Sequence, residues 1–282
     1  GQAYLAMVRS RYAHGIIRKI DRDAARALPG VLGVYTCADL DAAGFGTLKC
    51  ISPFVNRDGS PMKKPVRKAL ADTRVRHVGD PVAFVVAQTA TQAKDAAELV
   101  EIDYETLPAN GSLDAAHGAP RIWDAVPNNL VFDWGEGNEA GCKEAFAKAA
   151  KIVSVEVEQN RVVPNPMEPR GAIGLYDPAT GNYTLYTSTQ GPSTIRDRIA
   201  QSLLKIPNEK LRVVTEDVGG GFGMKASVVA EQALVLIAAA GDEFKVLGQA
   251  KLEEGPTRAS VAIAGSQLFV RTARNLYCFG DR

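Results

Sequence analysis

The sequence has little cysteine and histidine, and these residues are widely spread. Its 282 residues include four cysteines and three histidines. No two cysteines form a Cys-x-x-Cys pair, and no histidine stands near a cysteine. Zinc and iron–sulfur sites need several such ligands at short spacing, so we expect this chain to supply neither metal ligands nor a histidine-based catalytic site. Unpaired thiols are typical of a reducing compartment, and we therefore expect a cytoplasmic protein.

The sequence also lacks an excess of charge and a long apolar run. Its 33 basic and 32 acidic residues give a formal net charge of +1, which offers no electrostatic reason to expect a nucleic acid or a membrane as partner. The most apolar stretch, Val228–Ala240, contains Glu231 and Gln232 and is shorter than the about 18 residues that span a bilayer. The N-terminus has neither a Met nor a signal segment, so we expect it to be internal to a longer protein or processed.

Common catalytic motifs are missing, with one exception that we interpret as a turn. The sequence contains no Gly-x-Ser-x-Gly, no His-Glu-x-x-His and no phosphate-binding loop that ends in Gly-Lys-Ser/Thr. Residues Gly135–Ala140 fit the dinucleotide pattern Gly-x-Gly-x-x-Ala and follow the strand-like Leu130–Trp134. Glu136 and Glu139 would lie beside the pyrophosphate and repel it, which favours a turn. A nicotinamide-dependent enzyme is left as an alternative.

Residues 1–112 alternate between strand and helix patterns. Pro81–Ala87 is a continuous apolar run, which predicts a buried strand. Thr89 and Gln92 form a capping box, which predicts a helix from there to about Val100. Other predicted elements are strands at Tyr4–Val8, Gly15–Ile20, Val31–Thr36 and Glu101–Tyr104, and a short helix from Asp21 to Leu28. Residues 41–72 contain glycine, proline and a basic cluster, which predicts a long surface loop.

Residues 113–240 mix helices and strands, whereas residues 241–282 carry only strand patterns. In the first part we predict a helix at Lys143–Ala150, a half-buried strand at Ile152–Glu158, a hairpin of Gly171–Tyr176 and Tyr183–Thr187, a helix beginning at Pro192, a strand at Leu211–Thr215 and a buried helix at Val228–Ala239. In the second part we predict strands at Phe244–Ala250, Ala259–Ala264, Leu268–Thr272 and Leu276–Phe279. The sequence thus predicts an α+β protein with a short all-β tail.

A glycine-rich loop is the best candidate for a binding site. Gly219, Gly220, Gly221, Phe222 and Gly223 lie between a predicted strand and a predicted buried helix. Three consecutive glycines allow the backbone to approach a ligand closely and to direct several N–H groups at it, which suits phosphate or oxo groups. The alternative is a strained turn that binds nothing.

Gln190 is a second candidate, because it stands where a predicted strand ends and a helix begins. A side-chain amide at such a junction can donate an N–H to an oxo ligand without adding charge. The alternative is a polar residue that merely begins a helix.

Several segments, in order along the chain, resemble one known family. They are Val8–His14, Leu28–Val31, His77–Ala83, Val100–Pro108, Pro166–Arg170, Ser188–Gln190 and Gly219–Lys225. The first four resemble the α/β hammerhead domain of the molybdenum hydroxylase large subunit, and the last three resemble its first molybdopterin-binding domain. This family includes xanthine dehydrogenase, aldehyde oxidase and aerobic carbon monoxide dehydrogenase. The resemblance implies a hammerhead domain at residues 1–112 and a partial molybdopterin-binding domain at residues 113–240.

The resemblance implies a molybdenum–molybdopterin cofactor, in bacteria often the cytosine dinucleotide form. It also implies an oxidoreductase that hydroxylates aldehydes or N-heterocycles or oxidises carbon monoxide. In the family, the Gln that matches Gln190 approaches an oxo ligand of molybdenum, and the Phe-Gly that matches Phe222 and Gly223 packs at the metal and cofactor. The implied partners are an iron–sulfur subunit, an FAD subunit and a small-molecule substrate. Xanthine dehydrogenases carry a substrate-orienting Glu where Ala226 stands, so we do not expect a purine substrate.

Two departures from the family pattern limit what the resemblance implies. The second molybdopterin-binding domain, with the Glu that acts as catalytic base, has no counterpart in this sequence. We therefore expect a fragment that is inactive alone, and we assign no catalytic residue. Residues 241–282 instead resemble one blade of a quinoprotein-like β-propeller, through Ala259–Gly265 and Leu276–Gly280. The alternative function is a non-catalytic scaffold or interaction module derived from the same fold.

Overall fold

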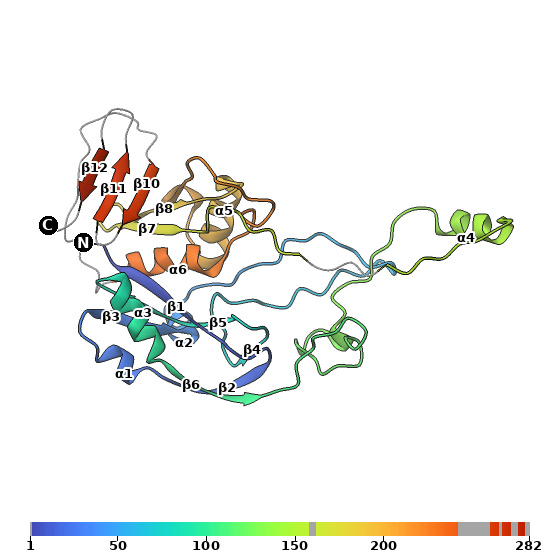
Figure 1. The fold of residues 1–282 in the computed structure, drawn as a ribbon, viewed down its shortest axis with the longest axis horizontal. Helices are drawn as coiled ribbons and strands as arrows, with labels where there is room; N and C mark the ends of the chain where they lie inside the picture. The colour runs from blue at the N-terminus through green and yellow to red at the C-terminus, as the bar shows by residue number, and fades with distance from the viewer. Residues whose placement is uncertain (1, 158–161, 242–259, 265–266, 272–275, 280–282) are drawn as a thin grey trace. The chain divides into compact units, whose positions relative to one another are not determined.

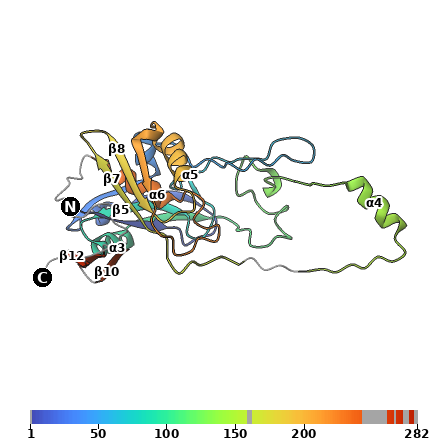
Figure 2. The same ribbon diagram turned by 90° about the horizontal axis from the view of Figure 1, so that it is seen from above.

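The structure, a computed structural model, describes residues 2–157, 162–241, 260–264, 267–271 and 276–279 (Figures 1 and 2). The chain forms two units, which are Ala3–Phe244, and Lys245–Arg282 together with Gly1–Gln2. In the described ranges, no helix is long and apolar enough to cross a membrane.

The first sheet of the larger unit is antiparallel, and its central strand is buried throughout. Strand β5 (Pro81–Ala87) lies between β1 (Tyr4–Arg9) and β3 (Val31–Thr36) (Figure 1). All residues of β5 are buried, as the continuous apolar run predicts for a strand that is covered on both faces. Helix α3 (Ala90–Glu98) packs against β1 and β5. The predicted strand and the predicted helix are both confirmed.

A capping box begins helix α3, as predicted. The Thr89 hydroxyl accepts a hydrogen bond from the Gln92 N–H at 3.2 Å, and the Gln92 side-chain oxygen accepts one from the Thr89 N–H at 3.1 Å. Both N–H groups lie in the first turn, where the helix itself offers no acceptor. Ala93 and Ala96 form the buried face of the helix.

The second sheet places β2 (Gly15–Asp21) between β4 (Arg74–Val75) and β6 (Glu101–Thr106). A short helix, α1 (Asp23–Arg26), follows β2. The helix is shorter than predicted, with N-cap Arg22 and C-cap Ala27, but the Asp21 carboxylate accepts a hydrogen bond from the Asp23 N–H at 3.2 Å, as predicted for a capping residue.

Helix α2 (Cys37–Ala42) was not predicted. Its first turn is capped, since the Asp39 carboxylate accepts hydrogen bonds from the N–H of Thr36 at 2.7 Å and from its hydroxyl at 2.8 Å. The predicted surface loop at residues 41–72 is wrong at its C-terminal end, because Ala69, Leu70 and Ala71 are buried.

The third sheet carries the elements that position the candidate site. Strands β7 (Ala172–Asp177) and β8 (Asn182–Thr187) form the predicted hairpin, and β9 (Leu211–Val214) pairs parallel with β8. The helical elements of this region are α5 (Pro192–Arg198), which continues as the π-helical η2 (Ile199–Leu204), then η3 (Asn208–Lys210) and α6 (Ala230–Ala239). Helix α6 packs along β7.

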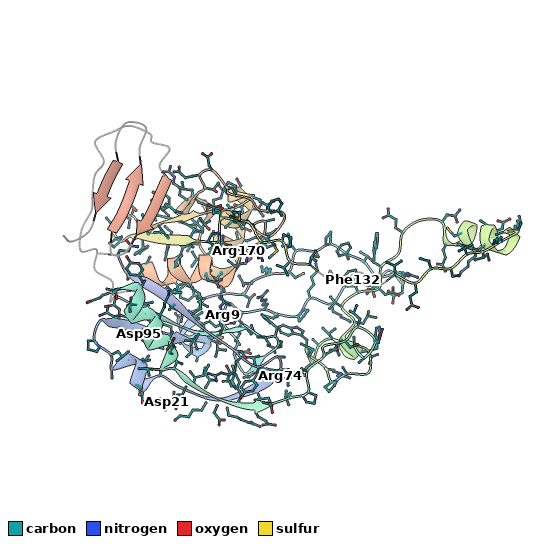
Figure 3. The ribbon with its side chains drawn as sticks, viewed as in Figure 1. Arg9, Asp21, Arg74, Asp95, Phe132 and Arg170 are labelled. Atoms are coloured by element: carbon teal, nitrogen blue, oxygen red, sulfur yellow. The ribbon has the colours of Figure 1, made fainter. Side chains whose placement is uncertain are left out.

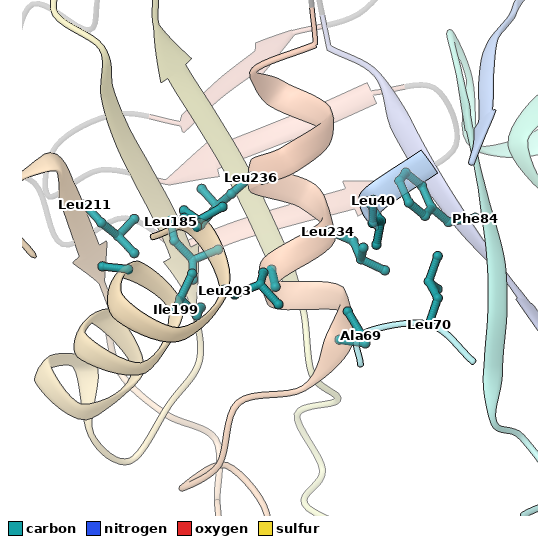
Figure 4. Close-up of a cluster of buried hydrophobic side chains, with 14 of the residues drawn as sticks. Leu40, Ala69, Leu70, Phe84, Leu185, Ile199, Leu203, Leu211, Leu234 and Leu236 are labelled. Atoms are coloured by element: carbon teal, nitrogen blue, oxygen red, sulfur yellow. The ribbon is translucent and has the colours of Figure 1, made fainter. Parts of the chain in front are cut away.

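One hydrophobic cluster connects the first and third sheets of the larger unit with α2, α5, η2 and α6. It includes Leu70 and Phe84 from the first half and Leu185 from β8. In the close-up of Figure 4, α6 passes between these groups, with Leu234 directed toward Leu70 and Leu236 directed toward Leu185. Burial of each such side chain stabilises the folded state by about 1.5–3 kcal/mol. Helix α6 is thus fixed on both sides, and with it the loop that precedes it.

The described residues of 107–157 and 162–171 contain little regular structure, namely the short η1 (Pro127–Asn129) and helix α4 (Glu139–Lys148), which buries none of its side chains. The predicted strand at Ile152–Glu158 is wrong for its described residues. Val153, Val155 and Val157 are 78%, 81% and 76% exposed and belong to no strand. The alternation is present, but in the described part of the chain no neighbouring strand pairs with it.

The residues before the dinucleotide-like pattern also differ from their prediction. Residues 130–134 form no strand, so the pattern at Gly135–Ala140 lacks the strand that a dinucleotide-binding turn follows. Phe132, marked in Figure 3, instead stacks on Phe54 with ring centroids 4.8 Å apart. The interpretation of this pattern as a turn agrees with the structure.

The smaller unit contains β10 (Ser260–Ala264), β11 (Gln267–Arg271) and β12 (Leu276–Phe279), which form an antiparallel sheet in that order. These strands coincide with three that the sequence predicts. The fourth predicted strand, at Phe244–Ala250, lies outside the described residues. The assignment of this sheet to a β-propeller blade stays a prediction.

Candidate functional site

The glycine loop connects β9 to α6 and departs from ordinary backbone conformation at three positions. Gly220 and Gly223 have φ of +93° and +84°, and Phe222 has φ of +48°. Glycine adopts such angles without cost, whereas Phe222 does not. The Phe222 side chain is also 72% exposed. A large apolar residue whose backbone is strained and whose side chain is exposed is typical of a binding site rather than of a plain turn.

Three consecutive N–H groups of the loop have no hydrogen-bond partner among the described residues. The Gly220 and Met224 N–H groups donate to the carbonyls of Val218 and Gly221, each at 2.8 Å. The next N–H after Met224, that of Lys225, donates to the Gln190 side-chain oxygen at 3.2 Å. Between Gly220 and Met224, the N–H groups of residues 221–223 donate to no acceptor among the described residues. Consecutive unpaired N–H groups in a loop with positive φ angles form a concavity that binds anionic oxygen atoms.

Gln190 lies directly against this loop, as the sequence predicts. A Cβ atom on Gly221 would come within 2.6 Å of the Gln190 Cδ atom, so only glycine permits this approach. The Gln190 N–H also donates to the Lys225 carbonyl at 3.1 Å. The Gln190 side-chain oxygen is the acceptor for Lys225, and its NH₂ group has no partner among the described residues. The structure therefore brings together all six predicted site residues.

An ion pair between the buried Lys225 and the partly exposed Glu168 was not predicted as part of the site. The Lys225 side chain is 1% exposed, and its ammonium lies 2.6 Å from a carboxylate oxygen of Glu168. The Ser188 hydroxyl donates to the same carboxylate oxygen at 2.7 Å. The hydrogen bond from Lys225, and then that from Ser188, hold the pKa of Glu168 below its usual value. These residues occur in the segments that resemble the family, but nothing in a single sequence reveals that they meet.

Arg170 completes the surroundings of the loop. Its guanidinium, labelled in Figure 3, donates a hydrogen bond to the Met224 carbonyl. No group of three or more His, Cys, Asp or Glu side chains that would hold a metal ion occurs in the described part of the chain. The N–H groups of the loop and the Gln190 amide are the donors that the site offers to a ligand.

Comparisons with known proteins agree with this geometry. The model of the aldehyde oxidase and xanthine dehydrogenase a/b hammerhead domain matches residues 1–108, and that of the molybdopterin cofactor-binding domain matches residues 122–246. Over these two ranges the chain is homologous to molybdenum-cofactor-dependent oxidoreductases. Its relatives include the carbon monoxide dehydrogenase large chain of Hydrogenophaga pseudoflava and the nicotine 6-hydroxylase large subunit of Paenarthrobacter nicotinovorans. The first is 33% identical over 81% of this chain, and the second is 34% identical over 84% of it.

Two solved structures share the fold over most of this chain. Quinoline 2-oxidoreductase from Pseudomonas putida 86 superposes with a TM-score of 0.75 at 35% identity, over 84% of this chain and 29% of that chain. Cu,Mo-CO dehydrogenase superposes with a TM-score of 0.72 at 31% identity. The chain spans 29% and 28% of the two curated relatives named above.

Proposed function

We propose that the glycine loop and Gln190 form part of the binding surface for a molybdenum–molybdopterin cofactor. The observation that carries the proposal is the run of three N–H groups at residues 221–223 beside the NH₂ group of Gln190, all without a hydrogen-bond partner among the described residues. Oxo and phosphate oxygens are acceptors that need such donors. The match of residues 122–246 to a molybdopterin cofactor-binding domain supports the same assignment.

The site fits such a cofactor because its surface is closely approachable and offers uncharged N–H donors beside the Arg170 guanidinium. The only described ammonium beneath the loop, that of Lys225, is paired with Glu168. Glycines at the loop allow the backbone to contact a ligand directly, and Phe222 offers an exposed apolar face beside the donors. The cofactor would supply two-electron oxidation with water as the source of oxygen. The residues of this chain would bind and orient it.

The proposed activity is that of an oxidoreductase which hydroxylates an aldehyde or N-heterocycle or oxidises carbon monoxide. The relatives include both a carbon monoxide dehydrogenase and a nicotine hydroxylase, which supports this range of reactions. Ala226 follows the loop lysine, and we therefore do not propose a purine substrate. We further propose that these 282 residues are inactive alone, because they cover less than a third of the named relatives. A non-catalytic scaffold is not favoured, since both domain models match.

The partners, the cofactor form and the domain bounds complete the proposal. Iron–sulfur and FAD subunits are the proposed partners, and the names "large chain" and "large subunit" of the relatives support an assembly of several subunits. The cytosine dinucleotide form of the cofactor and bounds at 112/113 and 240/241 are proposed on the resemblance alone. Free thiols at Cys37, Cys50 and Cys142 support a reducing compartment such as the cytoplasm.

The proposal is tested by the molybdenum and pterin content of the protein purified from cells that make the cofactor. In Gly221→Val the added side chain displaces Gln190 and removes its hydrogen bonds, so we expect about tenfold less cofactor than in the wild type. The matched control is Gly111→Val, because a Cβ on Gly111 meets nothing within 4 Å. Wild-type protein without molybdenum or pterin, or equal content in both variants, would contradict the proposal.

A further inference from the structure

We propose that Glu168 is a positioning residue that joins the two ends of the glycine loop and thereby fixes its unpaired N–H groups. The carboxylate does this from a distant part of the chain, since it stands 51 residues before Gly219 and 57 before Lys225. The value of fixing these groups rests on the proposed function, because fixed donors are useful only if a ligand binds them. The structural part of the proposal, however, concerns this chain alone.

A single oxygen atom of Glu168 makes the connection. Its Oε2 accepts a hydrogen bond from the Gly219 N–H at 2.7 Å, at the first glycine of the loop. The same atom accepts one at 2.6 Å from the ammonium of Lys225, which follows shortly after the last glycine, Gly223. The Ser188 hydroxyl donates to it at 2.7 Å, and the Lys225 ammonium also donates to that hydroxyl at 3.0 Å. The start of the loop, its end and the strand end that carries Gln190 therefore meet at one carboxylate.

The other hydrogen bonds of the loop lie on either side of residues 221–223. The Glu168 N–H donates to the Gly219 carbonyl at 3.3 Å, the Arg170 guanidinium donates to the Met224 carbonyl, and the Thr189 hydroxyl donates to the Lys225 carbonyl at 2.9 Å. Within the loop, the Met224 N–H donates to the Gly221 carbonyl at 2.8 Å, and the Ala226 N–H donates to the Gly223 carbonyl at 3.3 Å. None of these bonds involves the N–H groups at residues 221–223. Glycine has the greatest conformational freedom of all residues, so such a loop loses much entropy when it is ordered. Ordering it in advance lowers the entropy that a ligand must offset on binding.

Glu168 and Lys225 differ in how much they depend on each other. The Lys225 ammonium is buried, and in the described structure Glu168 is the carboxylate that neutralises it. The Glu168 side chain is 37% exposed, so water can solvate its charge when Lys225 is absent. Replacement of Glu168 therefore leaves a buried charge unpaired, whereas replacement of Lys225 does not. Both replacements remove the connection between the loop ends.

The test measures NMR order parameters of the backbone N–H groups at Gly221, Phe222 and Gly223 in the protein without cofactor. In the wild type we expect rigid values near 0.85, although these groups have no hydrogen-bond partner in the described structure. In Glu168→Ala, which removes the acceptor, and in Lys225→Met we expect values below about 0.6. Lys225→Met provides the result should Glu168→Ala fail to fold.

The matched control is Val34→Ala, which removes buried volume from the core of the first half without touching the loop. It lowers the melting temperature, and we expect it to leave the three order parameters as in the wild type. The proposal is overturned if the loop is already mobile in the wild type, if both site variants leave it rigid, or if Val34→Ala loosens it equally. A rigid wild-type loop that loosens in the site variants, in a protein that takes up no molybdenum, would uphold the role of Glu168 while rejecting the proposed function.

Discussion

Replacement of Gly174 by alanine tests whether helix α6 lies as close to the third sheet as the structure has it. Gly174 stands in β7, paired with Leu185 of β8. A Cβ atom there would lie 2.5 Å from the carbonyl oxygen of Val235 and 2.9 Å from the N–H nitrogen of Leu236. Both are backbone atoms of α6, so no side-chain rotation can relieve the contact. Since carbon atoms pack at about 3.5–4.0 Å, the helix has to move by on the order of 1 Å.

The cost of that movement follows from the way α6 is held. Its other side packs against Leu70 and Phe84 in the main cluster, so moving it compresses well-packed contacts there. Overpacking of this kind costs about 1–3 kcal/mol. For a unit of this size, about 1 kcal/mol lowers the melting temperature by about 2–4 °C. We therefore expect Gly174→Ala to lower it by about 2–12 °C.

The assay is thermal unfolding followed by circular dichroism, with Gly111→Ala as the control. A Cβ on Gly111 meets nothing within 4 Å, so this variant should melt like the wild type. Amide exchange in α6 should also be faster in Gly174→Ala. An unchanged melting temperature with unchanged exchange in α6 would refute the packing of this helix on β7.

Three further outcomes follow from single residues. Val85→Asp places an unpaired charge at a fully buried position of β5. Chemical denaturation should show a free energy of unfolding lower by more than about 3 kcal/mol. Near-wild-type stability would reject the assignment of β5 as the central strand. Thr89→Ala removes the N-cap of α3 and should lower the free energy of unfolding by about 1 kcal/mol. An unchanged free energy of unfolding would mean that the cap is dispensable. Because the hydrogen bond from Lys225 lowers the pKa of Glu168 below 4.5, the stability that Glu168 contributes is present above that pH and lost as the pH falls through the lowered value. The stability difference between wild type and Glu168→Gln, from denaturant titrations, should therefore shrink below about pH 4.5, and a constant difference would contradict this.

Local signals in the sequence predicted much of the fold. The apolar run of β5 and the capping box at Thr89 and Gln92 each act within a few residues, so one sequence carries them. Helix α2 could also have been predicted, because Thr36 and Asp39 stand at capping-box spacing. The alternating valines at residues 153–157 led to a wrong strand prediction, because alternation shows only that a segment is able to form a strand. Whether a partner strand exists is not a local property.

The sequence predicted the residues of the candidate site but not the contacts that hold them in place. Gly219–Gly223 and Gln190 were predicted from glycine content, from a position at a strand end and from the family resemblance. The joining of Glu168, Ser188 and Lys225 at one carboxylate depends on contacts across 20 to 57 residues. Such distant contacts are made only when the chain folds, and no periodicity or local motif encodes them.

The central claim is that the unpaired N–H groups at residues 221–223 bind the cofactor, and amide NMR shifts test it most directly. The protein is produced once in cells that make the molybdenum cofactor and once in cells that cannot. We predict that the N–H resonances of Gly221, Phe222 and Gly223 and the side-chain amide of Gln190 shift downfield only in the first sample, while that of Gly111 stays in place. Identical spectra from the two samples, or shifts confined to other parts of the chain in a protein that contains molybdenum, would contradict the claim.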